Sequence, residues 1–546
     1  MSLLLLPAAL LMGGWRDPML FAAGGAAVWA AVWMEGPQLG PAAAWLPWLG
    51  WAALAGLAGA QPAAALAPLA RWAAALAFFS LAAAWDERAR ELWVKSVLAA
   101  AVVLAAAALI SGVGQGYAQF MLGLLPPYYN YTAFALAAAA AAAAAWALHP
   151  RGPRGAWRAA ALAVSALSAF CVVLSTSRGG TLGLAVAAAV WSLRRWGRRA
   201  AAVGALAALA AFGAWRAAAM LPAVRARVEA RALKTYRPYS EVRPQIWRAS
   251  VLIADERPWF GEGPGAYVVG FRRHPARAQG GASLWGNWTE YAHSEFLQAA
   301  AETGWAGAAL WLVGFGALLS VLAAPADTEP AREAAAAALA AMSVQVCVDS
   351  MLQLPALAFL FFSAGALAGA RPRGGRRLPR AAAVLGAALA LGAGLPRALA
   401  RDPARAAVLF PADPLAREDL AYRAEKQGRL AEADALWTQA AARAPFDAIY
   451  PWRRAQIAAA EGRWTDAERL AAQATALEPG FLNARVLRAR ALIGLGRRAS
   501  ARVELNEVRR LRAQPLGYVY TGYDVAVSTL DAAEFSRVQA LSGAAR

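Results

Sequence analysis

The chain has 546 residues, of which 60% are hydrophobic and 16% are charged. A soluble protein normally carries about a quarter charged residues, so this composition excludes an ordinary soluble enzyme. The net charge of +20 would suggest nucleic-acid binding in a soluble protein. Here basic loops between apolar segments account for much of it, and no nucleic-acid partner is expected.

Charge-free stretches recur through the first 400 residues. No Asp, Glu, Lys or Arg lies between Glu35 and Arg71 or between Lys95 and Arg151. A helix needs roughly 20 apolar residues to cross a bilayer, so each stretch holds one or two crossings. We therefore predict an all-α, polytopic membrane bundle of about 12 to 13 helices. The predicted spans are 2–14, 18–34, 43–60, 64–84, 95–111, 131–148, 158–176, 179–193, 200–220, 297–323, 333–351, 354–370 and 381–399.

Three short basic loops set the expected orientation. They lie at 149–158, 194–199 and 371–380, and short basic loops stay in the cytoplasm. The two cysteines lie inside apolar spans, so neither a disulfide nor a metal framework is expected. The predicted domains are N-terminal membrane helices at 1–220, a large outer loop at 221–296, C-terminal membrane helices at 297–399 and an outer tail at 400–546.

The tail contains a repeat with a period of 34 residues, marked by Gly428, Gly462 and Gly496. Two sets of alanines keep the same register, Ala421, Ala455, Ala489 and Ala433, Ala467, Ala501. Alanine lets paired helices pack closely, and glycine suits the turn between them. The period resembles that of tetratricopeptide repeats. It predicts a C-terminal α-solenoid with repeats at about 414–447, 448–481 and 482–515, and a protein partner for this domain.

The stretch STSRGG at 175–180 places an arginine between two apolar spans, near the outer face. Arg178 either snorkels to lipid headgroups or serves a function. Ser175 and Ser177 add hydroxyls, and Gly179 lets backbone amides approach a ligand closely. A guanidinium can grip two phosphate oxygens at once. The functional interpretation is therefore a phosphate site at the membrane surface.

The outer loop and the span after it hold a second polar group. Arg243 and Trp247 precede a glycine-rich segment at 261–265, and HSEFLQAAAETGWAG runs from His293 into the next span. A histidine at a helix start is either a cap or packing residue, or a general base. Glu302 lies about two and a half turns further along, where it could pair with an arginine inside the bundle.

Other residues near the outer face have simpler expected roles. Loop aromatics such as Trp259, Trp285 and Tyr291 are equally consistent with sugar stacking and with membrane anchoring. Asp349 is expected to cap an outer hairpin. Arg71 is expected to snorkel, or to pair inside the bundle.

In this order and spacing, STSRGG, RPQIW…PWFGEGPGAY and HSEFLQAAAETGWAG resemble the O-antigen ligase and polymerase superfamily of integral membrane transferases. The similarity is close over 160–320, and the span pattern extends it to 1–400. Relatives with C-terminal tetratricopeptide repeats are a recognised variant. The resemblance implies a GT-C-like bundle in the bacterial inner membrane, with the active site, the large loop at 221–296 and the tail at 400–546 in the periplasm. It also implies a metal-independent, inverting glycosyltransferase without a cofactor, whose donor is a glycan on undecaprenyl diphosphate.

The resemblance also assigns roles to residues. Arg178 and Arg243 match basic residues expected to bind the donor diphosphate, and His293 matches the histidine proposed to activate or orient the acceptor hydroxyl. Ser294 stands where many relatives have asparagine. The segment 126–134 matches an asparagine-containing motif only loosely, so no role passes to Asn130. Further expected donor-site groups are Ser177 and Gly179, and possible supporting groups are Ser175, Trp247 and Glu302.

Several acceptors and one non-enzymatic function stay open. A ligase transfers the glycan to lipid A core, a polymerase extends another lipid-linked glycan, and a protein O-oligosaccharyltransferase uses a Ser or Thr side chain. The non-enzymatic alternative is a lipid-linked glycan transporter or a scaffold. A transporter would place polar groups near the bilayer midplane. Arg178, Arg243 and His293 are instead predicted at one face, which favours an enzyme.

Overall fold

The computed structural model describes residues 2–114, 125, 129–175, 177–197, 239–277, 283–286, 289–326, 329–369, 376–514 and 522–543. The predicted span 200–220, the start of the large loop and the first half of the basic loop at 371–380 lie outside the described residues.

Helices make up almost all regular structure in the described chain. The N-terminal group is α1 (Leu5–Leu11), α2 (Pro18–Glu35), α3 (Leu46–Ala58), α4 (Leu66–Ala83), α5 (Glu87–Gly114), α6 (Tyr129–Leu148), α7 (Gly155–Leu174) and a helix at 178–197. The next group is α10 (Tyr239–Glu256), α11 (Tyr267–Arg273), α12 (Glu295–Leu319), α13 (Pro330–Val348), α14 (Pro355–Ala368), α15 (Arg380–Gly392) and α16 (Leu395–Leu399). Two short antiparallel strands, β1 (Ala276–Arg277) and β2 (Trp285–Gly286), lie in the loop before α12.

The C-terminal group is α17 (Pro403–Leu409), α18 (Leu415–Lys426), α19 (Leu430–Arg443), α20 (Ile449–Ala460), α21 (Trp464–Leu477), α22 (Leu482–Gly494), α23 (Arg498–Arg512), α24 (Gly522–Ser528) and α25 (Ala532–Leu541). Short 3-10 helices lie at Ser2–Leu4, Gly13–Trp15, Gly40–Trp45, Pro62–Ala65 and Ser320–Ala323.

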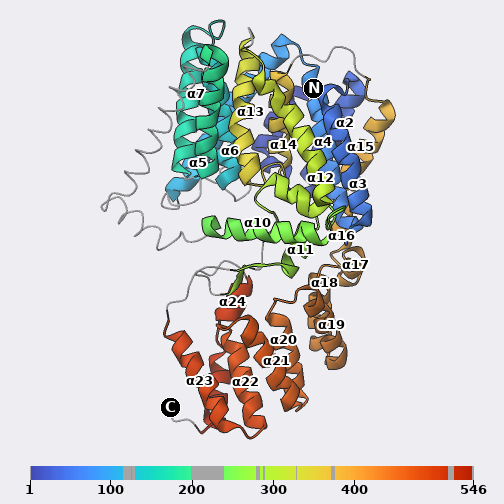
Figure 1. Cartoon of the computed structure of the whole chain (residues 1–546), viewed down its shortest axis with the longest axis vertical. Coiled ribbons are helices and arrows are strands. Elements are labelled where there is room, and N and C mark those ends of the chain that lie inside the picture. Colours follow the sequence, from blue (N-terminus) through green and yellow to red (C-terminus); the bar gives the residue numbers. More distant parts are fainter. Residues whose placement is uncertain are drawn as a thin grey trace, which may run out of the picture.

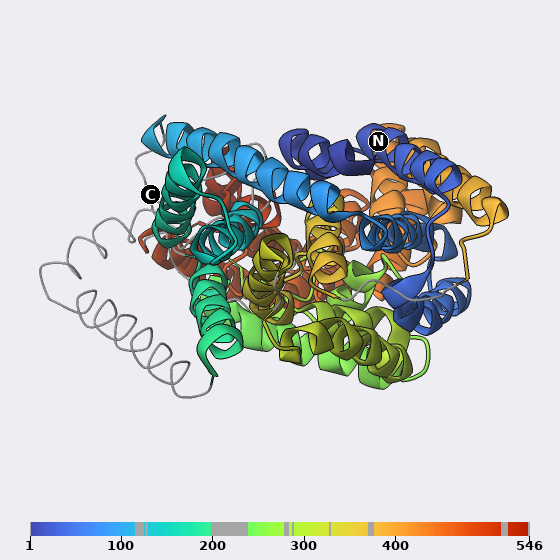
Figure 2. The same cartoon turned by 90° about the horizontal axis from the view of Figure 1, so that it is seen from above.

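The molecule has an apolar bundle above and a helical repeat domain below, with α10 between them (Figure 1). The bundle helices run along the long axis, and α10 lies across their lower ends. Seen from above, α10 and α12 lie on the same side of the bundle, where they pack against each other (Figure 2). The lower end of the bundle therefore faces both α10 and the repeats.

Within the described residues, eight helical segments are long and apolar enough to cross a membrane. They are Pro18–Glu35, Pro62–Ala83, Glu87–Ser111, Asn130–Leu148, Gly155–Leu174, Glu295–Ala323, Pro330–Val348 and Arg380–Leu399. Each overlaps a predicted span, and together they support a multi-pass membrane protein.

Three predicted spans form shorter helices. The α-helices α1, α3 and α14 have 7, 13 and 14 residues. A helix of 14 residues extends only about 21 Å, less than the roughly 30 Å hydrocarbon core of a bilayer. Every residue of α14 is buried, so protein surrounds this helix and it need not match the bilayer thickness.

Small residues allow the bundle helices to approach one another closely. An alanine run at 137–145 lies in α6, which packs against both α7 and α13. In the helix 178–197, a Cβ added to Gly183 would lie 2.3 Å from the Ala341 carbonyl oxygen of α13. This packing brings the start of α6, the end of α13 and the start of helix 178–197 together at the end of the bundle that faces α10.

The tail folds into three consecutive helix pairs, α18–α19, α20–α21 and α22–α23, which confirms the predicted repeat architecture. Gly428, Gly462 and Gly496 have φ values of 72°, 73° and 75°. A Cβ at any of them would meet nothing within 4 Å. Glycine is therefore needed at these turns for its left-handed backbone conformation and not for space.

Candidate functional site

His293 lies two residues before the first turn of α12. Its φ is 52°, in the left-handed region that residues other than glycine rarely adopt. Ser294 caps α12 by accepting a hydrogen bond from the Leu297 amide at 3.4 Å, and the Trp247 indole donates to the His293 carbonyl at 3.1 Å. A strained backbone of this kind persists only where its surroundings hold it, and such residues cluster at functional sites.

Asp349, at the C-terminal end of α13, joins three side chains from distant elements. Its Oδ1 lies 2.9 Å from His293 Nδ1, and its Oδ2 accepts from Arg243 Nη2 at 2.8 Å and from Asn130 Nδ2 at 2.7 Å. The residue is only 3% exposed, and a buried carboxylate of this kind requires such donors. The Ser350 amide also donates to Oδ1, so the expected turn-capping role is one part of what Asp349 does.

Arg243 reaches this cluster from α10. Its Nη1 donates to the Val348 carbonyl at 3.1 Å while its Nη2 binds Asp349. A quarter of the side chain remains exposed. The guanidinium is thus held in place by α13 and still has a surface that a ligand can contact.

The two serines of the STSRGG motif shape the start of the helix 178–197. The Ser177 Oγ accepts from the Gly180 amide at 3.2 Å, which makes Ser177 the N-cap. The Ser175 Oγ donates to a backbone carbonyl at 2.7 Å and accepts from the Ser177 amide at 3.3 Å. Both serines are buried, whereas Arg178 is exposed.

Gly179 places this motif beside the His293 cluster. A Cβ on Gly179 would lie 3.3 Å from the Gln345 side chain and 3.5 Å from the Val348 side chain. Val348 directly precedes Asp349, and its carbonyl is the one that Arg243 binds. Arg178 therefore lies at the exposed edge of the same end of the bundle.

The glycine-rich loop fits into a break in α12. Gly304 has φ 72° and ψ 174°, and a Cβ there would lie 2.5 Å from the Pro258 carbonyl oxygen. Gly261 has φ 59°, and its added Cβ would lie 2.5 Å from the Ala301 carbonyl oxygen. These glycines permit direct backbone contact, which fixes the loop after α10 against the helix that follows His293.

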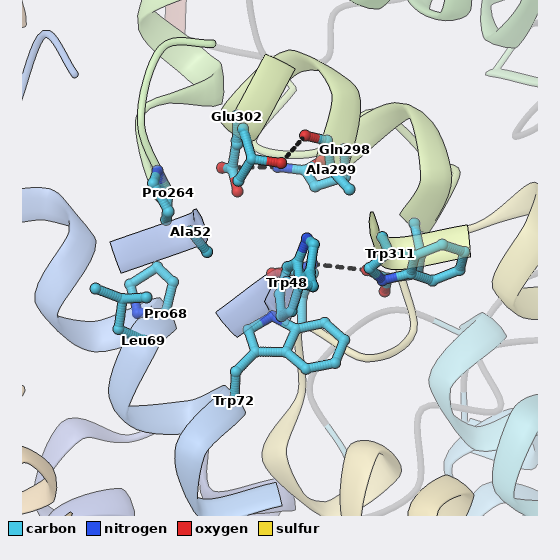
Figure 3. A pocket seen from close by; sticks show the side chains of 13 residues that line it. Trp48, Ala52, Pro68, Leu69, Trp72, Pro264, Gln298, Ala299, Glu302 and Trp311 are labelled. Carbon is cyan, nitrogen blue, oxygen red and sulfur yellow. Dashed lines mark hydrogen bonds between the residues drawn. The ribbon is translucent and has the colours of Figure 1, made fainter. Parts of the chain in front are cut away.

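Glu302 binds this loop instead of an arginine. Its carboxylate accepts from the Gly265 amide and from the Gln298 side chain, both at 2.9 Å, and it forms no ion pair among the described residues. Figure 3 shows Glu302 facing a pocket that Trp48 and Trp72 line from the opposite side. The pocket volume of about 20 Å³ is enough for roughly one water molecule, so this site is too small for a sugar.

The segment before His293 contacts the repeat domain. The Leu284 and Trp285 amides donate to the Glu478 carboxylate at 2.5 and 3.2 Å. The Trp285 ring packs on Phe446 with centroids 4.7 Å apart. Burial raises the pKa of Glu478 to about 7, although the two amide donors lower it. Trp285 therefore connects the loop to the repeats.

The sequence prediction missed Asn130 and Asp349. An acidic residue in an apolar segment was a usable signal for Asp349, because such residues usually face the bundle interior and have partners. No comparable signal marked Asn130, which becomes informative only through its bond to Asp349. The described residues contain no group of three or more His, Cys, Asp or Glu that could hold a metal ion.

Comparisons with known proteins agree with the motifs. Residues 162–312 match a family model described as O-antigen ligase, and residues 458–518 match a tetratricopeptide repeat model. The first match contains Arg178, Arg243 and His293, confirms the resemblance and supports a function of the O-antigen ligase or polymerase type. No curated protein matches the chain. One similar solved structure is the first tetratricopeptide domain of Spaghetti (RPAP3) bound to an HSP90 peptide. It is 18% identical and covers 24% of this chain and 94% of that one, with a TM-score of 0.20.

Proposed function

We propose that this chain is a glycosyltransferase that moves a glycan from undecaprenyl diphosphate to an acceptor at the outer face of the bacterial inner membrane, with inversion. The observation that carries the proposal is the His293–Asp349 pair beside Arg243, next to the Arg178 motif. Transfer of this kind needs a group that accepts the acceptor's proton and cations that stabilise the departing diphosphate. This end of the bundle supplies both.

His293 acts as the general base. Asp349 faces Nδ1 at 2.9 Å, so the ring proton resides on Nδ1 and Nε2 takes the proton of the acceptor hydroxyl. The acceptor oxygen then bonds to the anomeric carbon, while the bond from that carbon to the diphosphate oxygen breaks and its electron pair leaves with the diphosphate. A positioned base contributes roughly 10²–10⁴-fold to the rate.

Arg178 and Arg243 bind the donor diphosphate. Arginine stays charged and forks onto phosphate oxygens, and fixed cations stabilise the charge that develops on the leaving group. Arg243 is oriented by Asp349, and Arg178 is exposed at the start of its helix. Gly179 lets this helix start pack closely against Gln345 and Val348 of α13, while Ser177 fixes the turn. Charge stabilisation by the two arginines makes the transfer independent of a metal.

The acceptor is lipid A core or a second lipid-linked glycan, which makes the protein a ligase or a polymerase. Transfer to a protein side chain is the second candidate. It is favoured by the contact of Trp285 with the repeat domain, because a protein held by the repeats would lie close to the loop that carries His293.

Transfer by the purified full chain tests the proposal. Undecaprenyl-diphosphate oligosaccharide is supplied in EDTA-containing buffer, with lipid A core, excess lipid-linked glycan and a Ser/Thr-rich periplasmic protein as separate acceptors. We expect release of undecaprenyl diphosphate together with a larger glycan product, and the acceptor consumed identifies the reaction. His293→Ala and Arg178→Ala should remain folded and inserted but lose transfer. His149→Ala, at the far end of α6, is the matched control and should stay active.

One outcome would refute the enzyme function. If no acceptor is consumed but the lipid-linked glycan binds the chain and crosses liposomes, the arginines bind a cargo and the protein is a transporter.

A further inference from the structure

A second cavity opens beside the His293 cluster. Its volume is about 490 Å³, within the range that holds small ligands. The N-terminal ends of α2, α4 and α14 and the segment after α15 form its walls. Arg178, Arg243, His293 and Asp349 do not line it. The cavity therefore lies at the same end of the bundle as the proposed donor site but is a different site.

Three arginines line this cavity, Arg16, Arg71 and Arg397. Arg71 donates to the neutral Gln353 side chain at 2.5 Å, and its buried Nε has no hydrogen-bond partner in the described chain. Arg397 is exposed at the cavity. Arg16 approaches Glu290 only at 3.6 Å, and more than half of each side chain is exposed. Such exposed pairs are weak, so the arginines retain the capacity to bind an anion.

The other carboxylates in the cavity are committed elsewhere. Glu302 accepts from the Gly265 amide and from Gln298. Asp413 accepts from Arg272 at 3.4 Å and from the Leu415 amide at 3.0 Å. Neither carboxylate forms an ion pair with Arg71 in the described chain, and Arg71 reaches the Glu295 carboxylate only through Gln353, which donates to it at 2.8 Å. Arg71 lies in a predicted membrane span, where a charge needs a partner.

Tyr291 shows that the three arginines converge. Burial raises the pKa of its phenol, while the guanidiniums of Arg71, Arg16 and Arg397 all act to lower it. All three must therefore lie within electrostatic reach of one hydroxyl. Tyr291 also joins the cavity to the His293 cluster, because the Thr289 hydroxyl donates to the Tyr291 carbonyl at 2.6 Å and lies 3.5 Å from His293 Nε2.

We propose that this cavity, named here the Arg71 cavity, binds a phosphate group of a membrane-anchored acceptor and so delivers the acceptor hydroxyl to His293. The proposal rests on the proposed transferase function. In an inverting displacement the acceptor oxygen and the leaving diphosphate lie on opposite sides of the anomeric carbon, so each substrate needs its own binding position. Guanidinium groups bind phosphate by paired hydrogen bonds, and a cavity walled by the ends of membrane helices suits a ligand held in the bilayer.

Two phosphate-bearing acceptors fit this chemistry, a phosphorylated lipid A core and a second lipid-diphosphate glycan. Native mass spectrometry of the full chain in nanodiscs distinguishes them. The probes are phosphorylated lipid A core, the same lipid after dephosphorylation, and undecaprenyl-diphosphate oligosaccharide. A polymerase binds two copies of the last probe, whereas a ligase binds one copy and one phosphorylated lipid A core.

Three variants test the cavity. They are the double variant Arg71→Gln/Arg397→Gln, the single variant Arg397→Gln and the conservative variant Arg71→Lys. Arg380→Gln is the matched control, because Arg380 lies at the other end of α15, where it stacks on Trp33. The single Arg397→Gln variant removes only an exposed side chain, so it still tests the cavity if the double variant does not fold.

We expect the double variant to bind the phosphorylated acceptor at least roughly tenfold more weakly, while its first copy of the lipid-linked donor stays bound. Arg397→Gln should show a smaller loss, Arg71→Lys an intermediate one and Arg380→Gln none. The dephosphorylated lipid should bind weakly to all forms. Equal acceptor affinity in the wild type and the double variant would overturn the proposal.

Binding and turnover separate this proposal from the proposed function. The binding assay does not depend on glycan transfer. A wild-type protein that transfers no glycan would therefore refute the transferase function only. The comparison of the three lipid probes would still decide which ligand the cavity binds. Normal transfer with an unchanged KM for the acceptor in the double variant would refute the Arg71 cavity alone.

Discussion

Asp349→Asn tests the His293 cluster most directly. The native carboxylate binds His293 Nδ1, Arg243 Nη2, Asn130 Nδ2 and the Ser350 amide. Asparagine keeps the shape but supplies one acceptor oxygen and one amino group. In one orientation the amino group faces the donors of Arg243 and Asn130. In the other it faces His293 Nδ1, so the ring proton has to move to Nε2 and the base is lost.

The magnitude follows from the role of the base. A positioned base contributes roughly 10²–10⁴-fold, and the same substitution in a Ser-His-Asp triad lowers kcat by about 10⁴. We therefore expect kcat for undecaprenyl-diphosphate release to fall by roughly 10²–10⁴-fold. Loss of the charge-assisted bonds should also lower the free energy of unfolding by about 1–3 kcal/mol, which thermal melting in detergent measures.

Ser350→Ala is the matched control. The Ser350 hydroxyl is buried without a hydrogen-bond partner in the described chain, and its removal leaves the backbone bond to Asp349 in place. This variant should keep wild-type kcat. A folded Asp349→Asn protein with kcat within about threefold of wild type would contradict the role of Asp349 in orienting the base.

Other variants test the remaining contacts. Arg243→Lys keeps the charge but loses the forked geometry, so binding of undecaprenyl diphosphate should weaken about tenfold, and unchanged binding would count against this donor site. Gly304→Ala should lower the free energy of unfolding by at least about 1–3 kcal/mol, because its φ is 72° and the new Cβ meets a carbonyl oxygen at 2.5 Å. In the same helix, Gly316→Ala meets nothing within 4 Å and should leave melting unchanged or raise it. Because the pKa of Glu478 is raised from 4.5 to about 7, its contribution to stability is full below pH 4.5 and is lost as the pH rises through about 7. Glu478→Gln should flatten that dependence, and an equally steep melting profile in the variant would assign the effect to another group.

Local and periodic properties of the chain were readable from the sequence. Apolar run length predicted the eight helical segments that are long enough to cross a membrane, and the 34-residue spacing of Gly428, Gly462 and Gly496 predicted turns that adopt a positive φ. The alternation of spans and basic loops also predicted that Arg178 and His293 lie at one end of the bundle. These inferences succeed because hydrophobic burial and turn geometry depend on neighbouring residues.

Contacts between distant elements were decided only by the tertiary structure. Asn130 and Asp349 are 219 positions apart, and Arg243 and Asp349 are 106 apart, yet each pair shares a hydrogen bond. The sequence marks Asp349 only as an acidic residue in an apolar segment and gives no signal for Asn130. The convergence of Arg16, Arg71 and Arg397 on one cavity likewise depends on how four segments pack. Sequence spacing determines which residues share a helix face, but only tertiary packing determines which faces meet. The proposed chemistry depends on that packing, because its residues come from different helices.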